Sequence, residues 1–225
     1  MRWMLRVVVV SALAVMSIGG SAQAAAGGGA ASGWHIGYYA PSGNALSFAS
    51  APSAGTAGIA NLAFTNQPNT ALLVTDQPAQ WGSLLGDLTG KTLSASFTIS
   101  GLNAGATFSY YEEPTCGGTT SYVRYFFETS NAGGFAYTHY WWSNPVSAPL
   151  TGNGGPVALT SVPLDPSAWS DWNGQFGTTD PAAFAAAVSN VTMIGLSFGG
   201  GCFFENGVGT SDGSGTFTLN TYTAS

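Results

Sequence analysis

The sequence predicts an all-β protein, a two-sheet antiparallel β-sandwich with one short helix near residues 181–189. Short segments that alternate apolar with polar residues, or carry β-branched and aromatic runs, recur between clusters of Gly, Asn, Pro and Asp. The clearest helical pattern is the segment "DPAAFAAAVSN". Hydrophobic residues make up 45% of the chain and aromatic residues 13%, which is ample for a packed core and excludes disorder for most of the chain.

The N-terminus has the parts of a secretory signal peptide, which we place at residues 1–24. Arg2 and Arg6 supply a basic region, "VVVVSALAVMSIGG" is an apolar stretch too short to span a membrane comfortably, and an A-x-A cleavage signal ends at Ala24. We therefore expect a secreted protein, extracellular or periplasmic, with no membrane association after cleavage. A retained anchor is the less favoured alternative, because small residues and the cleavage signal follow the apolar stretch.

Residues 25–33, "AAGGGAASG", are expected to form a flexible leader, and residues 34–225 a single β-sandwich domain. Removal of the signal peptide takes the formal net charge from −6 to −8 and leaves Lys91 and Arg124 as the basic side chains. A surface of this charge repels nucleic acid and anionic lipid, so neither is an expected partner.

The expected elements follow one another along the chain. The strands are assigned to "KTLSASFTISG" (91–101), "ATFSYYEE" (106–113), "YVRYFFETS" (122–130), "FAYTHYWWS" (135–143), "VALTSVPL" (157–164), "VTMIGLSF" (191–198) and "GTFTLNTYT" (215–223). In the helix, Asp180 can act as N-cap, Pro181 fits the first turn, and Phe184 and Val188 form the buried edge. A second short helical turn is expected in "AQWGSLLGD". Many strands with one late helix favour a jelly roll over an immunoglobulin-type sandwich.

The two cysteines, Cys116 and Cys202, are expected to form a disulfide, because an exported protein matures in an oxidising compartment. The bond would close a loop of about 86 residues, which the chain-entropy model values at about 4 to 5 kcal/mol. Two buried thiols or a metal pair are the weaker alternatives, since no His or Cys stands at ligand spacing beside either cysteine.

The C-terminal half, from "WSDWNGQFG" onward, resembles the closing segment of bacterial secreted jelly-roll domains of the carbohydrate-binding-module and laminin-B-like kind. The shared features are a Trp-rich loop, a short helix, the strand "VTMIGLSF" and the final strand "GTFTLNTYT". The resemblance covers less than half of the chain, and the last strand lacks the Asp-Asn pair associated with the laminin-B-like group. It implies a jelly-roll fold and suggests sugar binding.

The aromatic-rich stretch "FAYTHYWWSNP" raises the question of which side chains face solvent. A four-residue hairpin loop at residues 131–134 would pair Glu128 with Tyr137, Phe126 with His139, and Arg124 with Trp141. Arg124 favours solvent for this face, because an unpaired guanidinium rarely enters a small core. The expected ligand-binding face then consists of Tyr122, Arg124, Phe126, Glu128, Tyr137, His139 and Trp141. The opposite face, with Trp142, would belong to the core, and an odd loop length would invert the second strand.

Such a face has the chemistry of a sugar platform, since a pyranose ring rests its C–H groups on an aromatic ring while Arg, Glu and His pair with its hydroxyls. The alternative is that a loop such as "WSDWNGQFG" covers these aromatics and that Arg124 and Glu128 form a structural ion pair. The two interpretations are about equally favoured by the sequence.

No catalytic residue is assigned from the sequence. If the protein is an enzyme, Glu128 with Glu112 or Glu113 is the candidate acid and base, because glycan hydrolysis needs two carboxyl groups across the scissile bond. Glu112 and Glu113 point to opposite faces of a strand and are more typical of a solvated strand end. No metal site or cofactor is assigned; Asp171, Asp180 and Asp212 could supply oxygen ligands to a structural Ca²⁺, but they are equally ordinary turn and cap residues.

Three functions remain open. The favoured hypothesis is a secreted, non-catalytic domain that recognises a neutral polysaccharide or oligosaccharide through an aromatic face. The alternatives are a jelly-roll glycan hydrolase or lyase, and a surface or matrix protein with a structural or protein-interaction role. Binding without release of sugar, release of product, and silence on every glycan distinguish the three.

Overall fold

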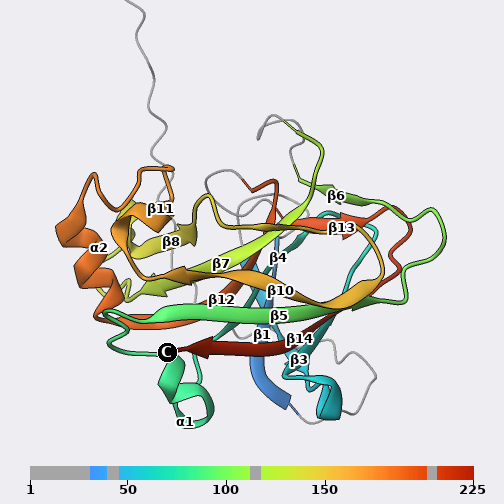
Figure 1. The fold of residues 1–225 in the computed structure, drawn as a ribbon, viewed down its shortest axis with the longest axis horizontal. Helices are drawn as coiled ribbons and strands as arrows, with labels where there is room; N and C mark the ends of the chain where they lie inside the picture. The colour runs from blue at the N-terminus through green and yellow to red at the C-terminus, as the bar shows by residue number, and fades with distance from the viewer. Residues whose placement is uncertain (1–30, 40–45, 112–117, 202–206) are drawn as a thin grey trace, which may run out of the picture.

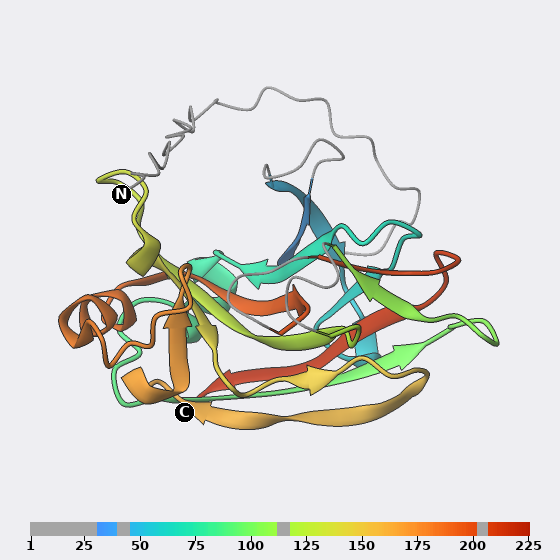
Figure 2. The same cartoon turned by 90° about the horizontal axis from the view of Figure 1, so that it is seen from above.

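The structure is a computed structural model that describes residues 31–39, 46–111, 118–201 and 207–225. It confirms the predicted sandwich of two antiparallel sheets with one short helix near the C-terminus (Figure 1). The smaller sheet lies on one side of the molecule, and the strands drawn in blue lie on the opposite side (Figure 2). The signal peptide expected at residues 1–24 and both cysteines lie outside the described residues.

The larger sheet is built on a path of seven neighbouring strands. In spatial order these are β11 (Trp169–Asp171), β8 (Tyr140–Ser143), β7 (Tyr122–Thr129), β12 (Val191–Gly199), β4 (Thr70–Thr75), β1 (Ala31–Tyr39) and β2 (Leu46–Pro52). Off this path, β13 (Val208–Thr210) pairs with β4 and with β6 (Phe108–Tyr110), and β9 (Ala148–Pro149) pairs with β7.

The smaller sheet contains β10 (Gly154–Pro163), β5 (Thr92–Ser100), β14 (Thr216–Ala224) and β3 (Ala60–Ala63), in that order. The sequence of β5 explains why this sheet forms, because apolar and polar residues alternate along the strand. Buried side chains are Leu93, Ala95, Phe97 and Ile99, while the serines and threonines between them lie nearer to solvent. The chain crosses repeatedly between the two sheets, as in jelly-roll sandwiches.

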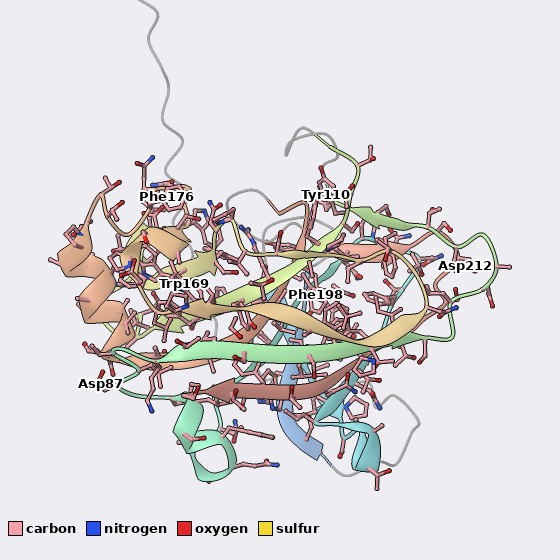
Figure 3. The ribbon with its side chains drawn as sticks, in the orientation of Figure 1. Asp87, Tyr110, Trp169, Phe176, Phe198 and Asp212 are labelled. Carbon is pink, nitrogen blue, oxygen red and sulfur yellow. The ribbon has the colours of Figure 1, made fainter. Side chains whose placement is uncertain are left out.

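The main core lies between the sheets. Phe217 of β14 stacks on Phe97 at a centroid distance of 4.8 Å and meets Phe198 of β12 edge-on at 5.1 Å. Figure 3 shows Phe198 near the middle of the sandwich. Tyr222 of β14 similarly contacts Trp34 of β1, with ring centroids 5.4 Å apart. These contacts between aromatic rings from both sheets fix the two layers face to face.

Short helices and 3₁₀ turns connect several of the strands. The chain contains α1 (Pro78–Trp81), α2 (Pro181–Val188) and the 3₁₀ turns η1 (Gly55–Ala57), η2 (Gly82–Leu84), η3 (Tyr137–His139) and η4 (Pro166–Ala168). The predicted caps of α2 are confirmed, because the Asp180 carboxylate accepts from Ala183 N at 3.0 Å and Pro181 opens the first turn. Phe184 and Val188 are buried as expected. The second helical turn, expected in residues 79–87, is α1 followed by η2.

Strand β1 begins at Ala31, inside the leader expected at residues 25–33. Ser32 is buried and donates to Ala51 O at 2.7 Å, and Trp34 is fully buried. Residues 31–33 of the expected leader therefore belong to strand β1. Within the described residues, no helix has the length and apolar character needed to cross a membrane.

Candidate functional site

The pairing of β7 with β8 differs from the predicted hairpin. Phe126 lies opposite Trp142, Phe127 opposite Trp141, and Glu128 opposite Tyr140. The four-residue loop is wrong because β8 begins only at Tyr140, after the 3₁₀ turn η3 has interrupted the alternation expected for residues 135–143. An odd number of residues now separates paired positions, so the second strand is inverted relative to the prediction.

In this register, Trp141 and Trp142 each lie on the face opposite to the predicted one. Trp141, expected on the ligand-binding face, is 1% exposed and packs in the main core against Phe184 at a centroid distance of 4.9 Å. Trp142, expected in the main core, lies on the outer face of the larger sheet, the face that points away from the smaller sheet. It is nevertheless fully buried there, packed on Phe126 and bonded through Nε1 to Ser197 Oγ at 3.1 Å.

The other residues of the predicted face divide into three groups. Arg124 and Phe126 project from the outer face as expected but are buried, with the Arg124 guanidinium carbon 5.9 Å from the ring centroid of Trp142. Tyr122 and Glu128 are partly buried on the same strand. Tyr137 and His139 lie in the turn η3 rather than in a strand; Tyr137 is exposed and His139 is partly buried.

Above Trp142 lies a group of four aromatic side chains that we call the aromatic patch: Phe135, Tyr137, Tyr140 and Trp172. Phe135 is its centre, with ring centroids 5.3 Å from Tyr137, 5.6 Å from Tyr140 and 5.7 Å from Trp172. Trp172 also contacts Trp142 at 5.9 Å. The patch therefore stands on a buried aromatic base at the end of the sandwich where β8 and β11 lie (Figure 1).

Polar contacts hold the patch in place. Asn131 Nδ2 donates to the Tyr140 hydroxyl at 2.7 Å, and Asn131 Oδ1 lies 2.6 Å from His139 Nδ1. On the other side, the buried Asp171 carboxylate accepts from Asn173 N and Gln175 N, each at 2.9 Å, and so fixes the turn that carries Trp172. The loop "WSDWNGQFG" thus contributes to the patch instead of simply covering it.

From Tyr140, a line of side chains crosses the outer face of the larger sheet. Glu128 lies opposite Tyr140 on one side and opposite Met193 on the other. Asp76 follows Thr75, whose partner is Ile194, and therefore stands next to Met193 at the end of β4. His35 Nε2 of β1 lies 3.3 Å from Asp76 Oδ1. We call Tyr140, Glu128, Met193, Asp76 and His35 the outer row.

The carboxyl groups of the outer row have different surroundings. Burial, reinforced by the negative charge of Asp76, raises the pKa of Glu128 to about 7. Among the described residues, no hydrogen bond or ion pair to the Glu128 carboxyl group is found, so nothing there offsets the burial. Asp76, in contrast, has a side chain that is 44% exposed, and its Oδ1 accepts from Gln77 Nε2 at 2.6 Å.

The remaining acidic candidates lie elsewhere. Glu112 and Glu113 are outside the described residues, so their pairing with Glu128 stays untested. The three aspartates considered as calcium ligands serve turns and caps: Asp171 in the turn before Gln175, Asp180 at α2, and Asp212 bonded to Ser214 and Asn103. Among the described residues there is no group of three or more His, Cys, Asp or Glu side chains that could hold a metal ion.

The predicted ligand-binding face did not include Asp76, His35 and Met193 of the outer row. It also left out Phe135, Tyr140 and Trp172 of the aromatic patch. Asp76 carries a weak signal, since it directly ends the apolar run "ALLVT", where a strand meets solvent. Its neighbour in space, Glu128, is 52 positions away along the chain, and only the order of the strands brings the two together.

No protein-family model matches the chain, and neither the curated proteins nor the solved structures contain a match. Function therefore has to be argued from the aromatic patch and the outer row.

Proposed function

We propose that this protein is an exported glycan-binding domain that holds an uncharged saccharide on the aromatic patch. The observation that supports the proposal is the exposure of Phe135 and Tyr137, which are 56% and 49% exposed while they contact one another edge-on. Large aromatic rings that remain in water while packed on a firm base are typical of stacking surfaces for sugar rings.

The charge of the chain favours an uncharged ligand. After signal cleavage the formal net charge is −8 and the basic side chains are Lys91 and Arg124, of which Arg124 is buried. A polyanionic glycan would meet repulsion and few cationic partners. A neutral sugar needs only ring stacking and hydrogen bonds, and its affinity should change little between low and high salt.

Hydrogen-bonding groups at the edge of the patch suit the hydroxyls of a sugar. The Asn131 amide donates to the Tyr140 hydroxyl, and the His139 imidazole adjoins Tyr140 along the chain. Together they offer donors and acceptors around an apolar centre, which is the arrangement that fixes the orientation of a saccharide. The weak C-terminal resemblance to sugar-binding jelly rolls points in the same direction.

The test is to screen the secreted protein on an array of neutral polysaccharides and to measure the affinity of each hit by calorimetry. We expect Tyr137→Ala and Phe135→Ala to weaken binding about tenfold each, because each removes a stacking ring. Tyr111→Ala is the matched control, since Tyr111 is 47% exposed and directly follows β6, which lies at the opposite end of the sandwich from β8 and β11 (Figure 1).

Equal losses of affinity in all three variants would contradict the proposal, because they would show that any exposed aromatic ring binds the glycan non-specifically. Silence of the wild-type protein on every glycan would also contradict it and would favour the structural or protein-interaction role.

A further inference from the structure

We propose that Glu128 and Asp76 act together on the bound glycan as the acid and the base of a hydrolase that inverts the configuration of the anomeric carbon. This inference rests on the proposed glycan binding and adds a reaction to it. It replaces the pairing of Glu128 with Glu112 or Glu113, which lie outside the described residues.

Glu128 and Asp76 lie on the same outer face of the larger sheet, close to the aromatic patch. Glu128 adjoins the aromatic patch through Tyr140, its partner across the β7–β8 pair. Asp76 lies on the far side of β12, so one strand separates the two carboxyl groups. A glycan stacked on the patch and extended along the outer row would therefore lie over Glu128, Met193 and Asp76 in turn.

The distance between the two carboxyl groups suits an inverting reaction. Two strand spacings put the backbones of β7 and β4 about 10 Å apart, and side chains on one face of a sheet stand roughly perpendicular to it. Two carboxyl groups separated by a distance of this order leave room for a water molecule between one carboxylate and the sugar. Inverting enzymes need this room and have their two carboxyl groups about 6.5–9.5 Å apart. Retaining enzymes need about 5–5.5 Å, which is close to the spacing of adjacent strands rather than of strands that lie two apart.

The surroundings of the two carboxyl groups assign the acid to Glu128 and the base to Asp76. Burial raises the pKa of Glu128 to about 7, so this group keeps a proton to donate near neutral pH. Asp76 is 44% exposed and accessible to water, and its Oδ1 is held by Gln77 Nε2 at 2.6 Å and lies 3.3 Å from His35 Nε2. His35 and Gln77 are positioning residues, because they orient Asp76 and need not touch the sugar.

The reaction balances with water as the co-reactant. The Glu128 carboxyl group gives its proton to the glycosidic oxygen, and the bond between that oxygen and the anomeric carbon breaks. A water oxygen bonds to the anomeric carbon from the opposite side while Asp76 takes one of its protons. Exchange of protons with solvent then returns Glu128 to its acid form and Asp76 to its carboxylate form.

The test separates binding from turnover. The wild-type protein is incubated with laminarin, xylan, mannan and amylose, and the release of reducing ends is measured together with binding to each polysaccharide. We expect wild-type protein to release sugar from a polysaccharide that it binds, with inverted anomeric configuration by nuclear magnetic resonance. Glu128→Gln and Asp76→Asn should each lower the rate at least about 100-fold while the affinity changes less than about threefold.

Asp87→Asn is the matched control, because Asp87 is an exposed carboxylate that caps a local turn and an asparagine can replace it there. Its rate should equal that of the wild type. Melting curves of all variants show whether a lower rate results from unfolding. The retained affinity of Glu128→Gln is a second check that this variant is folded.

Each outcome decides between the two proposals. Wild-type protein that binds a polysaccharide and releases nothing overturns the hydrolase and leaves glycan binding intact. Protein that binds none of the polysaccharides overturns the proposed function itself, and with it the reaction. Release of sugar with retained configuration, or full activity of Asp76→Asn, overturns the assignment of Asp76 as the base.

Discussion

At the scale of single residues, Glu128 couples the stability of the fold to pH. Its pKa is about 7 in the folded protein against an ordinary value of 4.5, so the folded state binds the proton more tightly than the unfolded state. Stability is therefore highest below pH 4.5 as far as this group is concerned and falls as the pH rises to about 7.

We expect Glu128→Gln to be more stable than wild-type protein at pH 8, by at most about 3 kcal/mol, and equally stable near pH 4. Urea unfolding of both proteins at several pH values measures this difference. A constant difference across the pH range would contradict the assignment of a buried, protonated Glu128.

The two adjacent tryptophans give a second residue-scale prediction. Trp141 is 1% exposed and its Nε1 donates to Thr138 O at 2.7 Å, so Trp141→Ala removes core packing and should cost about 3–5 kcal/mol of unfolding free energy. Tyr137→Ala, at an exposed position, should change stability by about 0.5 kcal/mol or less. Denaturant unfolding measures both. A Trp141→Ala protein with wild-type stability and no glycan binding would restore the predicted hairpin and contradict the observed register.

At the scale of elements, the sequence predicts what local patterns determine and fails where distant segments decide. Strand β5 alternates strictly, and α2 carries its own cap at Asp180, so both were predicted within a few residues. The segment 135–143 was assigned to one strand because its aromatic residues favour β structure. Tyr137–His139 instead form one 3₁₀ turn, and this single turn inverts every side chain after it.

The candidate site follows the same rule. The outward side of β7 was assigned correctly from Arg124, although the buried state of that residue follows from its packing on Trp142. The aromatic patch joins residues of three segments, and the pair Glu128 and Asp76 depends on β12 lying between β7 and β4. Periodicity along a chain contains no information about which strands become neighbours, so these parts of the site needed the structure.

At the scale of the whole molecule, export and cross-linking remain predictions from the sequence. Strand β6 pairs with β13, and beyond this pair Tyr111 N donates to Gly207 O at 3.1 Å. Cys116 and Cys202 each lie five positions along the chain from this bond. Neither cysteine is among the described residues, so the bond between them is expected from the sequence alone.

We therefore expect the secreted protein to begin at Ala25 and to contain a bond between Cys116 and Cys202. The intact mass should be two hydrogens lower before reduction than after it, and alkylation without reductant should add nothing.

Cys116→Ser with Cys202→Ser should lower the unfolding free energy by about 2–5 kcal/mol, the usual cost of a lost disulfide in an exported domain. Reductant should destabilise the wild-type protein and leave the double variant unchanged, because only the wild type has a bond to lose. Two thiols that alkylate freely in the folded wild-type protein would contradict the bond, and an N-terminus that still carries Arg2 and Arg6 would contradict cleavage.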